Sequence, residues 1–337
     1  MVVLSADQAF RRAYECYCAG RMDEAVSLCR AMLKVEPGHP HGSFLLALIA
    51  AREGRPAEAD QLLARAVERR AHSITLDFPP PDAPRHAERP NPALYAALER
   101  NTAHYNGLLQ SFARFLPGLG RIPAASRNQE DPHWNNPWMP ASDGMALYCL
   151  IALKQPRRYV EVGSGISTRF VRRAIRDHGL STVIVSVDPE PRAEVDALCD
   201  EVIRAPFEHT DPGLFRELGA GDMVFVDSSH RCFMGSDVTV LFTEVLPSLA
   251  AGVTVGLHDI FLPFDYPGEW VPRYYSEQYL LACYLLAGGA PFRVVLPMHF
   301  ALAHPDCADA ARILAGALPP GIAPGGTSFW LEMTGAR

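Results

Sequence analysis

Ionisable side chains follow two apolar runs of the sequence, a pair after each run. Asp227 and His230 come after the run MVFV, and His258 and Asp259 come after the run VTVGL. Imidazole and carboxylate groups can exchange protons near neutral pH or bind a divalent cation. Buried charges without partners cost too much free energy to be kept for packing alone. These side chains are therefore candidates for proton transfer or metal binding.

A glycine loop provides a second candidate site. Gly163 and Gly165 follow the apolar run YVEV and would let the backbone turn sharply and approach a ligand closely. A dinucleotide fingerprint requires glycine or alanine at position 168, where this chain has Thr168. Glu161 disfavours an anionic pyrophosphate and suits a cationic ligand group. The expected cofactor-binding residues of this segment are Glu161, Gly163, Ser164, Gly165 and Ser167.

Asp188 ends the next apolar run, 23 residues after Gly165. A carboxylate at this position can bind both hydroxyls of a ribose. It could instead begin the following helix as its N-cap. Because the glycine loop and the carboxylate occur together, we favour the ribose role for Asp188.

The second half of the chain alternates strand and helix patterns, which predicts an α/β, Rossmann-like, doubly wound parallel sheet. The expected strands are 158–162, 182–188, 201–205, 222–227, 253–259, 292–296 and 328–333. The expected helices between them are 167–178, 192–200, 238–249 and 274–286. The last two strands would form an antiparallel pair at one edge. Functional groups gather at the carboxyl ends of such strands, so both candidate sites should converge there.

Four segments together resemble class I S-adenosylmethionine-dependent methyltransferases, in particular a bacterial subgroup with VDSSH-like and HDIFLPFDYP-like motifs. These segments are residues 161–168, 188–192, 222–230 and 258–267. The likeness covers about residues 130–337. It implies that the glycine loop binds S-adenosylmethionine and that an oxygen, or a nitrogen, of a small-molecule acceptor is methylated.

The chain is also distantly similar to metal-dependent O-methyltransferases. That resemblance implies a metal-binding Asp227, a general base at His230 and a further acidic ligand at Asp259. His258 departs from the pattern, because the metal-dependent relatives have an acid or amide there. We expect Asp227 and His230 to be catalytic and any divalent cation (Mg, Mn or Fe) to lie on Asp227, His258 and Asp259. Without a metal, His230 alone could accept the proton.

The N-terminal segment carries an internal repeat. GRMDEA at residues 20–25 recurs as GRPAEA at 54–59, an offset of 34 residues. This is the period of tetratricopeptide repeats, which the segment resembles. Because two repeats bury little core, we expect them to bind a protein partner, to self-associate or to stabilise the rest of the chain.

These patterns divide the chain into three parts. Residues 1–72 form the tetratricopeptide-like repeats, residues 73–125 a proline-rich linker with a connecting helix at about 93–115, and residues 126–337 the methyltransferase domain. The loop 261–270 is a candidate substrate wall, with Asp265, Tyr266 and Trp270 as its members. His299 could reach the same site but is left out of it.

Composition excludes several classes of protein. The formal net charge is −7 and no Lys/Arg block occurs, which argues against a nucleic-acid partner. No apolar run is long enough for a membrane span, so we expect a soluble, cytoplasmic protein. The 8 cysteines form no CxxC pair and are expected to be reduced thiols.

Two other functions stay open at this point. His230 and His258 with Asp227 or Asp259 could form the two-histidine, one-carboxylate iron site of an oxygenase on the same sheet. The chain could also be a non-catalytic interaction protein that uses its repeats. Iron analysis would discriminate the first alternative, and ligand titration the second.

Overall fold

The structure, a computed structural model, divides into two compact units. It describes residues 6–35, 40–67, 83–126, 128, 130–191, 195–288 and 290–335. The first unit is Met1–Pro80 and the second is Pro81–Arg337. The division falls inside the predicted linker 73–125, while the predicted boundaries at residues 72 and 126 stay predictions. No described helix is long and apolar enough to cross a membrane.

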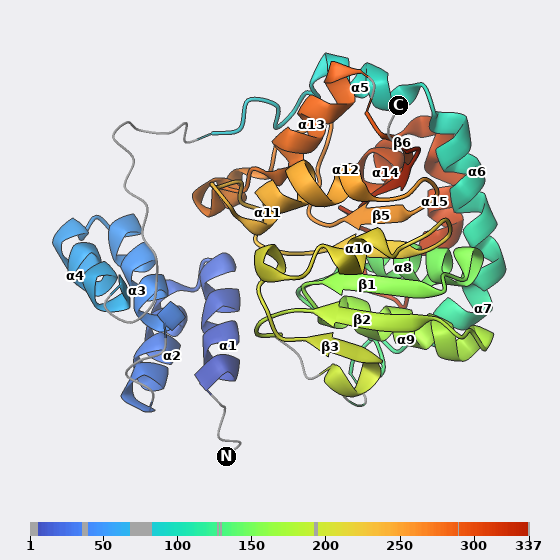
Figure 1. The fold of residues 1–337 in the computed structure, drawn as a ribbon. Helices are drawn as coiled ribbons and strands as arrows, with labels where there is room; N and C mark the ends of the chain where they lie inside the picture. The colour runs from blue at the N-terminus through green and yellow to red at the C-terminus, as the bar shows by residue number, and fades with distance from the viewer. Residues whose placement is uncertain are drawn as a thin grey trace. The chain divides into compact units, whose positions relative to one another are not determined.

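The first unit consists of antiparallel helix pairs, as the repeat predicts (Figure 1). Its described helices are α1 (Ala6–Cys18), α2 (Met22–Val35), α3 (Pro40–Arg52) and α4 (Pro56–Val67). Both repeats turn in the same way. Gly20 and Gly54 each have φ +73°, and the amides of Arg21 and Arg55 donate to carbonyls five residues earlier, at 2.8 and 2.9 Å. The same backbone hydrogen bond therefore recurs 34 residues later, with the period of the sequence repeat.

The second unit is built on a seven-stranded sheet in the order β3-β2-β1-β4-β5-β7-β6. The strands are β1 (Arg158–Val162), β2 (Val183–Val187), β3 (Glu201–Ile203), β4 (Met223–Val226), β5 (Thr254–Leu257), β6 (Phe292–Pro297) and β7 (Phe329–Met333). The first five run parallel, and β7 lies antiparallel between β5 and β6. The predicted doubly wound sheet with an antiparallel pair of last strands is confirmed.

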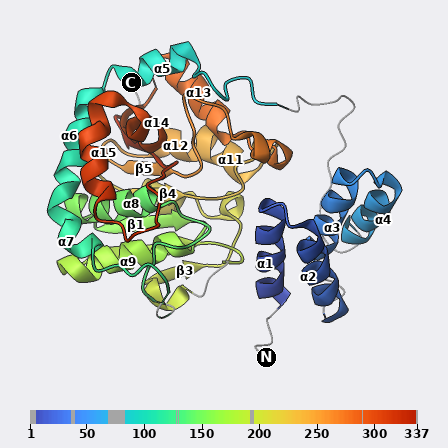
Figure 2. The same cartoon turned by 180° about the vertical axis from the view of Figure 1, so that it is seen from behind.

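Helices cover both faces of the sheet (Figures 1 and 2). The neighbours α8 (Ala141–Lys154) and α9 (Ile166–His178) cover one face. On the other face lie α10 (Gly213–Arg216), α11 (Asp237–Val240), the π-helix η4 (Leu241–Val245), α12 (Leu246–Ser248) and α13 (Glu277–Ala287). The strands β2, β4 and β5 are mostly apolar because both of their faces are buried, whereas the edge strand β3 is largely exposed.

The connecting helix predicted at 93–115 is instead a broken set of helices in the main core. The segment folds as α5 (Pro92–Glu99), α6 (Thr102–Phe112), η1 (Ala113–Phe115) and α7 (Leu116–Leu119). Leu98 and Tyr105 are fully buried in the same apolar cluster as the sheet. Their burial explains why this segment is part of the second unit rather than a spacer.

Two further differences concern helices. The predicted helix 192–200 is absent from its described part, which holds only the short η2 (Asp196–Leu198). Asp200 instead bonds the chain to β2, since its carboxylate accepts from the amide of Ile184 at 2.8 Å. Helices α14 (Met298–Ala303) and α15 (Ala308–Ala315), with η6 (Pro305–Cys307), lie between the last two strands and were not predicted.

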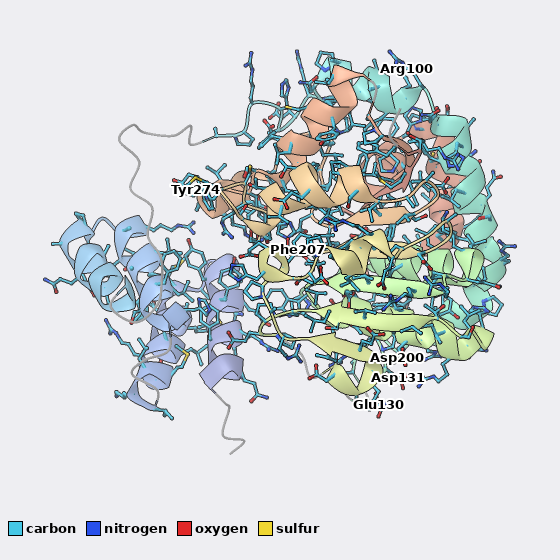
Figure 3. The ribbon with its side chains drawn as sticks, in the orientation of Figure 1. Arg100, Glu130, Asp131, Asp200, Phe207 and Tyr274 are labelled. Atoms are coloured by element: carbon cyan, nitrogen blue, oxygen red, sulfur yellow. The ribbon has the colours of Figure 1, made fainter. Side chains whose placement is uncertain are left out.

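The loop before α8 is fastened to α9. Trp134 is 2% exposed and its ring lies 5.2 Å from that of Phe170. Asp131, labelled in Figure 3, pairs with Arg176 and lies 3.6 Å from Arg173. These contacts hold the loop against α9.

Candidate active site

The glycine loop after β1 is in direct contact with the backbone after β4. Gly163 has φ +82°, and a Cβ there would lie 1.9 Å from the carbonyl oxygen of Asp227. Its own amide donates to Val187 at 3.0 Å, and the amide of Asp227 donates to Val162 at 2.9 Å. Glycine is required by both the backbone conformation and the close approach. The predicted nucleoside loop and the predicted acid–base group are therefore backbone neighbours.

Glu161 lies fully buried beneath this loop, with neutral hydroxyl groups as its bonding partners. Tyr159 donates to its Oε1 at 2.9 Å, and Thr168 donates to its Oε2. Thr168 also accepts the amide of Gly165 at 3.1 Å, a role that the sequence did not reveal. Burial raises the pKa of Glu161 to about 7, because hydrogen bonds from Ser167, Thr168 and Tyr159 only partly offset the loss of water.

Asp188 bridges the loops after β1 and β2. Its Oδ2 accepts the amide of Ser164 and its Oδ1 accepts the amide of Glu190, both at 2.8 Å. Ser164 is further tied to Ser186 by a hydroxyl contact of 2.6 Å. Each carboxylate oxygen of Asp188 keeps a second lone pair, so these bonds orient the group without exhausting it.

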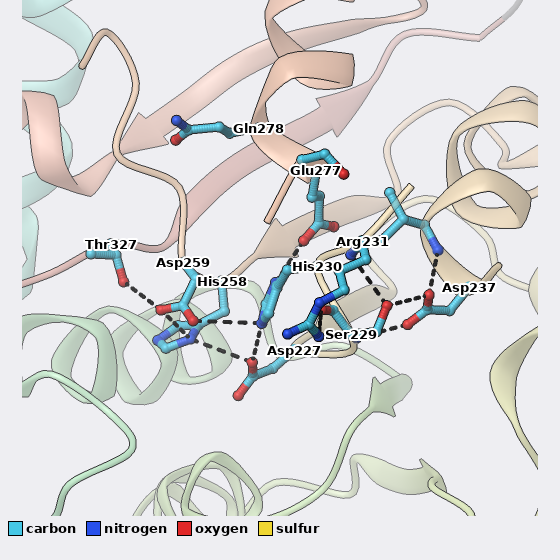
Figure 4. A network of polar contacts seen from close by, with 12 residues as sticks. Asp227, Ser229, His230, Arg231, Asp237, His258, Asp259, Glu277, Gln278 and Thr327 are labelled. Carbon is cyan, nitrogen blue, oxygen red and sulfur yellow. Dashed lines mark hydrogen bonds and ion pairs between the residues drawn. The ribbon is translucent and has the colours of Figure 1, made fainter. Parts of the chain in front are cut away.

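Asp227, His230 and Asp259 meet at the ends of β4 and β5 (Figure 4). His230 Nε2 lies 3.1 Å from Asp227 Oδ1 and 3.5 Å from Asp259 Oδ2. His230 is almost fully buried, whereas the side chains of Asp227 and Asp259 are 28% and 15% exposed. The carboxylates are therefore the parts of this group open to a ligand, and the imidazole lies behind them.

His258 lies beside the same group, among three carboxylates. Its Nδ1 is 3.4 Å from Asp259 Oδ1 and 3.6 Å from Asp227 Oδ1, and its Nε2 is 3.4 Å from Asp143 Oδ2. Neither nitrogen has a hydrogen-bond partner among the described residues. Asp143 accepts the amides of Thr327 and Ser328 at 2.7 and 2.8 Å, which fixes it under the site.

The carboxylates and imidazoles of this site shift one another's pKa values strongly. Burial alone would raise the pKa of Asp227, but His258 and His230 outweigh it and hold that pKa well below its usual range. Burial would lower the pKa of His230, yet bonds to Asp227 and Glu277 raise it well above the ordinary value. The pKa of His258 is also raised, against burial, by Asp227, Asp259 and Asp143. Positive charge is therefore favoured at this point of the sheet edge.

One group within the described chain has the donors and spacing of a metal site. Asp227, His230 and Asp259 each offer a ligand atom, and these atoms lie within 4.8 Å of one another. The sequence predicted His258 in place of His230, and His258 borders this group. Two carboxylates and an imidazole are a donor set for magnesium, manganese or iron.

Two of the site residues have unusual backbone conformations. His230 and Asp259 have φ values of +58° and +55°, the left-handed region that non-glycine residues seldom adopt. Such conformations cost free energy and are kept where the surroundings over-determine them. For His230 the surroundings are the start of α13, where the amides of Ser276 and Glu277 donate to its carbonyl at 2.8 and 3.2 Å.

Most members of the predicted substrate wall have structural partners. Asp265 accepts the amide of His86 at 2.7 Å and the hydroxyl of Tyr279 at 3.2 Å. Tyr266 is 5% exposed, and its hydroxyl accepts the amide of Gln278 at 3.3 Å. Trp270 is better placed, since its ring lies 5.6 Å from that of Tyr275, which packs 4.7 Å from the ring of His230. His299 packs against Phe261 and Phe264.

Sequence reasoning missed Asp143 and Glu277. Both are fully buried charges that contact a site histidine, at 3.4 Å to His258 and 2.8 Å to His230. The sequence did contain a signal for both residues, because each acid lies at the start of a strongly apolar helix. A charge there needs a buried partner.

Two family models match parts of this chain. Residues 160–260 match the family model described as a methyltransferase domain, and residues 19–74 match the tetratricopeptide repeat model. A search of curated proteins finds no match. The family models therefore describe two segments of the chain.

Solved structures of low similarity were also found. The cofactor-bound Rv0187 from MTB is 19% identical over 73% of this chain and 91% of its own, with a TM-score of 0.31. The SAH-bound methyltransferase PaMTH1 of Podospora anserina is 17% identical over 71% and 96%, with a TM-score of 0.34. The branched-chain polyamine synthase of Thermus thermophilus is 13% identical over 87% and 82%, with a TM-score of 0.33.

The family models identify a methyltransferase domain at residues 160–260 and tetratricopeptide repeats in front of it, at residues 19–74.

Proposed function

We propose that the enzyme transfers a methyl group from S-adenosylmethionine to a hydroxyl oxygen of a small molecule, with His230 as the general base. One observation carries this proposal. The glycine loop that would hold the donor touches the backbone of Asp227, whose carboxylate lies 3.1 Å from His230 Nε2. Methyl donor and base would thus be neighbours, as an in-line displacement requires.

The donor would bind at the carboxyl ends of β1 and β2. Asp188 would accept the ribose hydroxyls with its free lone pairs, and the loop of Gly163, Ser164 and Gly165 would approach the donor closely. Glu161 and Ser167 lie beneath that loop, where a carboxylate favours the cationic amino-acid end of the donor. These roles follow from the fixed orientation of Asp188 and from the buried charge of Glu161.

The chemistry is a displacement at the methyl carbon. The acceptor oxygen forms a bond to that carbon while the carbon–sulfur bond breaks, and the electron pair of the broken bond stays on sulfur. Because the raised pKa of His230 favours the protonated ring near neutral pH, the hydroxyl proton passes to His230 Nε2 in the fraction of the protein whose ring is neutral, and this nitrogen faces the exposed carboxylates of Asp227 and Asp259. Those carboxylates would orient the acceptor and stabilise the imidazolium that results.

The donor set also fits a divalent cation. Asp227 and Asp259 would hold it, with His258 or His230 beside them, and the surplus of carboxylates over histidines at this point favours added positive charge. A bound cation would lower the pKa of the acceptor hydroxyl. Removal of metal with EDTA, followed by addition of magnesium, manganese or iron, tests this part of the proposal.

The test of the base uses the purified full-length chain. S-adenosylhomocysteine release is measured from S-adenosylmethionine with a panel of phenols and sugar hydroxyls. His230→Ala should keep its affinity for S-adenosylhomocysteine and lose turnover by about 10²–10⁴, the usual contribution of a general base. His209→Ala, an exposed histidine on η3 (Phe207–His209), is the matched control. Full activity of His230→Ala would refute the assignment.

The repeats would add a surface for a protein partner or for self-association. Residues of the repeat turn are held by the same hydrogen bonds in both copies, which favours a repeated docking element over an irregular appendage. Gel filtration of the chain with and without residues 1–72 separates self-association from partner binding.

A further inference from the structure

Arg169 is a buried cation that the chemistry described so far does not use. It belongs to the first turns of α9 and is only 7% exposed. Its Nε has no hydrogen-bond partner, and its side chain makes no ion pair with any residue that the structure describes. Burial lowers the pKa of Arg169, yet an arginine keeps its proton in a protein. A charge hidden from water without a partner is costly, so we expect an anion to bind here.

The loop beside Arg169 contains two more buried nitrogens that lack partners among the described residues. They are Nε1 of Trp134 and Nδ1 of His133, in the segment before α8. The ring of Trp134 packs 5.2 Å from that of Phe170, the residue after Arg169. The positive charge of Arg169 adds to burial in lowering the pKa of His133, which places these two side chains near each other. Because a guanidinium and an indole nitrogen can only donate, this part of the molecule offers hydrogen bonds to an acceptor that the described chain does not supply.

Arg169 lies about one helical turn from the glycine loop. α9 begins directly after that loop, and four residues of helix rise by about 6 Å. Side chains of a helix lean toward its N-terminus, so the side chain of Arg169 leads back toward the loop. Thr168, the residue before it, bonds both the amide of Gly165 and the buried Glu161. An anion at Arg169 would therefore adjoin the proposed site of the methyl donor.

We propose that Arg169 binds the carboxylate at the amino-acid end of the methyl donor. That end of S-adenosylmethionine carries an ammonium and a carboxylate, and Glu161 would attract only the ammonium. A guanidinium can bind a carboxylate through two parallel hydrogen bonds, which suits a buried cation without a protein partner. The identity of the ligand rests on the proposed function, whereas the need for an anion at Arg169 does not.

Titration calorimetry of the full-length protein with two ligands isolates this carboxylate. The ligands are S-adenosylhomocysteine and its decarboxylated form, which keeps the ammonium and lacks only the carboxylate. The wild type should bind S-adenosylhomocysteine about 10–100-fold more tightly, the contribution of a charge-assisted hydrogen bond. Arg169→Met should bind S-adenosylhomocysteine about 10–100-fold more weakly than the wild type does. It should bind the decarboxylated form as tightly as before, or more tightly, because a like charge has been removed.

Arg176→Met is the matched control. Arg176 lies on the same helix but pairs with Asp131, so its substitution removes the same charge without removing the unpartnered cation. The preference for S-adenosylhomocysteine should then be unchanged. Urea unfolding without ligand separates a binding role from a structural one. Because Arg169 has no partner among the described residues, Arg169→Met should leave the ligand-free protein at least as stable as the wild type.

Equal affinity of the wild type for the two ligands would overturn the proposal, and this comparison does not depend on any variant being folded. An unchanged preference in folded Arg169→Met would overturn it as well. So would equal weakening of both ligands or a clear loss of ligand-free stability in that variant, since either result indicates a structural role. In all these cases S-adenosylhomocysteine still binds the wild type, so the proposed function stands. Failure of the wild type to bind either ligand would contradict the proposed function, and this inference with it.

Discussion

Replacement of Gly163 by alanine should destabilise the second unit, Pro81–Arg337, more than an ordinary glycine substitution does. Two free-energy costs add at this position, one from the backbone conformation and one from steric overlap. The backbone has φ +82°, where a side chain costs about 1–2 kcal/mol. The new Cβ would also lie 1.9 Å from the carbonyl oxygen of Asp227, and relieving such an overlap by moving backbone typically costs about 1–3 kcal/mol.

Gly179→Ala separates the two costs. Gly179 follows α9 with φ +62°, but a Cβ there has no neighbour within 4 Å. It therefore shares the conformational cost and the loss of unfolded-state entropy, and lacks the overlap. Gly163→Ala should lower the free energy of unfolding by about 1–3 kcal/mol more than Gly179→Ala does.

Urea unfolding followed by tryptophan fluorescence measures this difference. All 4 tryptophans lie between residues 134 and 330, so the signal reports the second unit and not the repeats. Equal destabilisation by the two substitutions would refute the close contact between the glycine loop and Asp227. It would also remove the observation on which the proposed function depends.

Two further predictions concern pH. The pKa of Glu161 is about 7 in the folded protein against an ordinary 4.5, so this residue's favourable contribution to folding is present at acid pH and lost as pH rises between those values. Glu161→Gln should therefore raise the free energy of unfolding by about 3 kcal/mol at mildly alkaline pH and change it little at acid pH. It should also weaken S-adenosylmethionine binding. Urea titrations that show the same effect of the substitution at both pH values would contradict this prediction. Manganese binding must displace protons from His230 and His258, whose pKa values are raised, so its affinity should increase as pH rises toward those raised values. Calorimetry checks this with two variants. Asp227→Asn should lose binding. Asp237→Asn should keep it, because among the described residues that carboxylate bonds Ser229 and the start of α11.

The sequence predicted the sheet and the convergence of groups at its edge, because both depend on local patterns. Apolar runs define the strands, and parallel strands place the residues that follow them at one edge. The order of the runs along the chain was therefore enough to bring Asp227, His230 and Asp259 together. The repeat was predictable for a similar reason, since its period reflects one helix pair after another.

Other parts of the site come from helices that no local pattern connects to it. Glu277 contacts a residue 47 positions earlier, and Asp143 accepts amides from residues 184 and 185 positions later. Such contacts depend on how helices pack on the sheet. The helix wrongly predicted at 192–200 shows the same limit, because Asp200 is fixed by its bond to β2 rather than by helix propensity.

Titration calorimetry with S-adenosylhomocysteine tests the central claim most directly. Wild-type protein should bind it, and Asp188→Ala should bind it more weakly by about 1.5–3 kcal/mol, the contribution of a charge-assisted hydrogen bond. Because Asp188 also bridges two loops, thermal unfolding of the variant must show that the fold is intact. The account predicts weaker binding in a folded variant. Unchanged affinity in that variant, no binding to the wild type, or equal affinity of the wild type for NAD would contradict it.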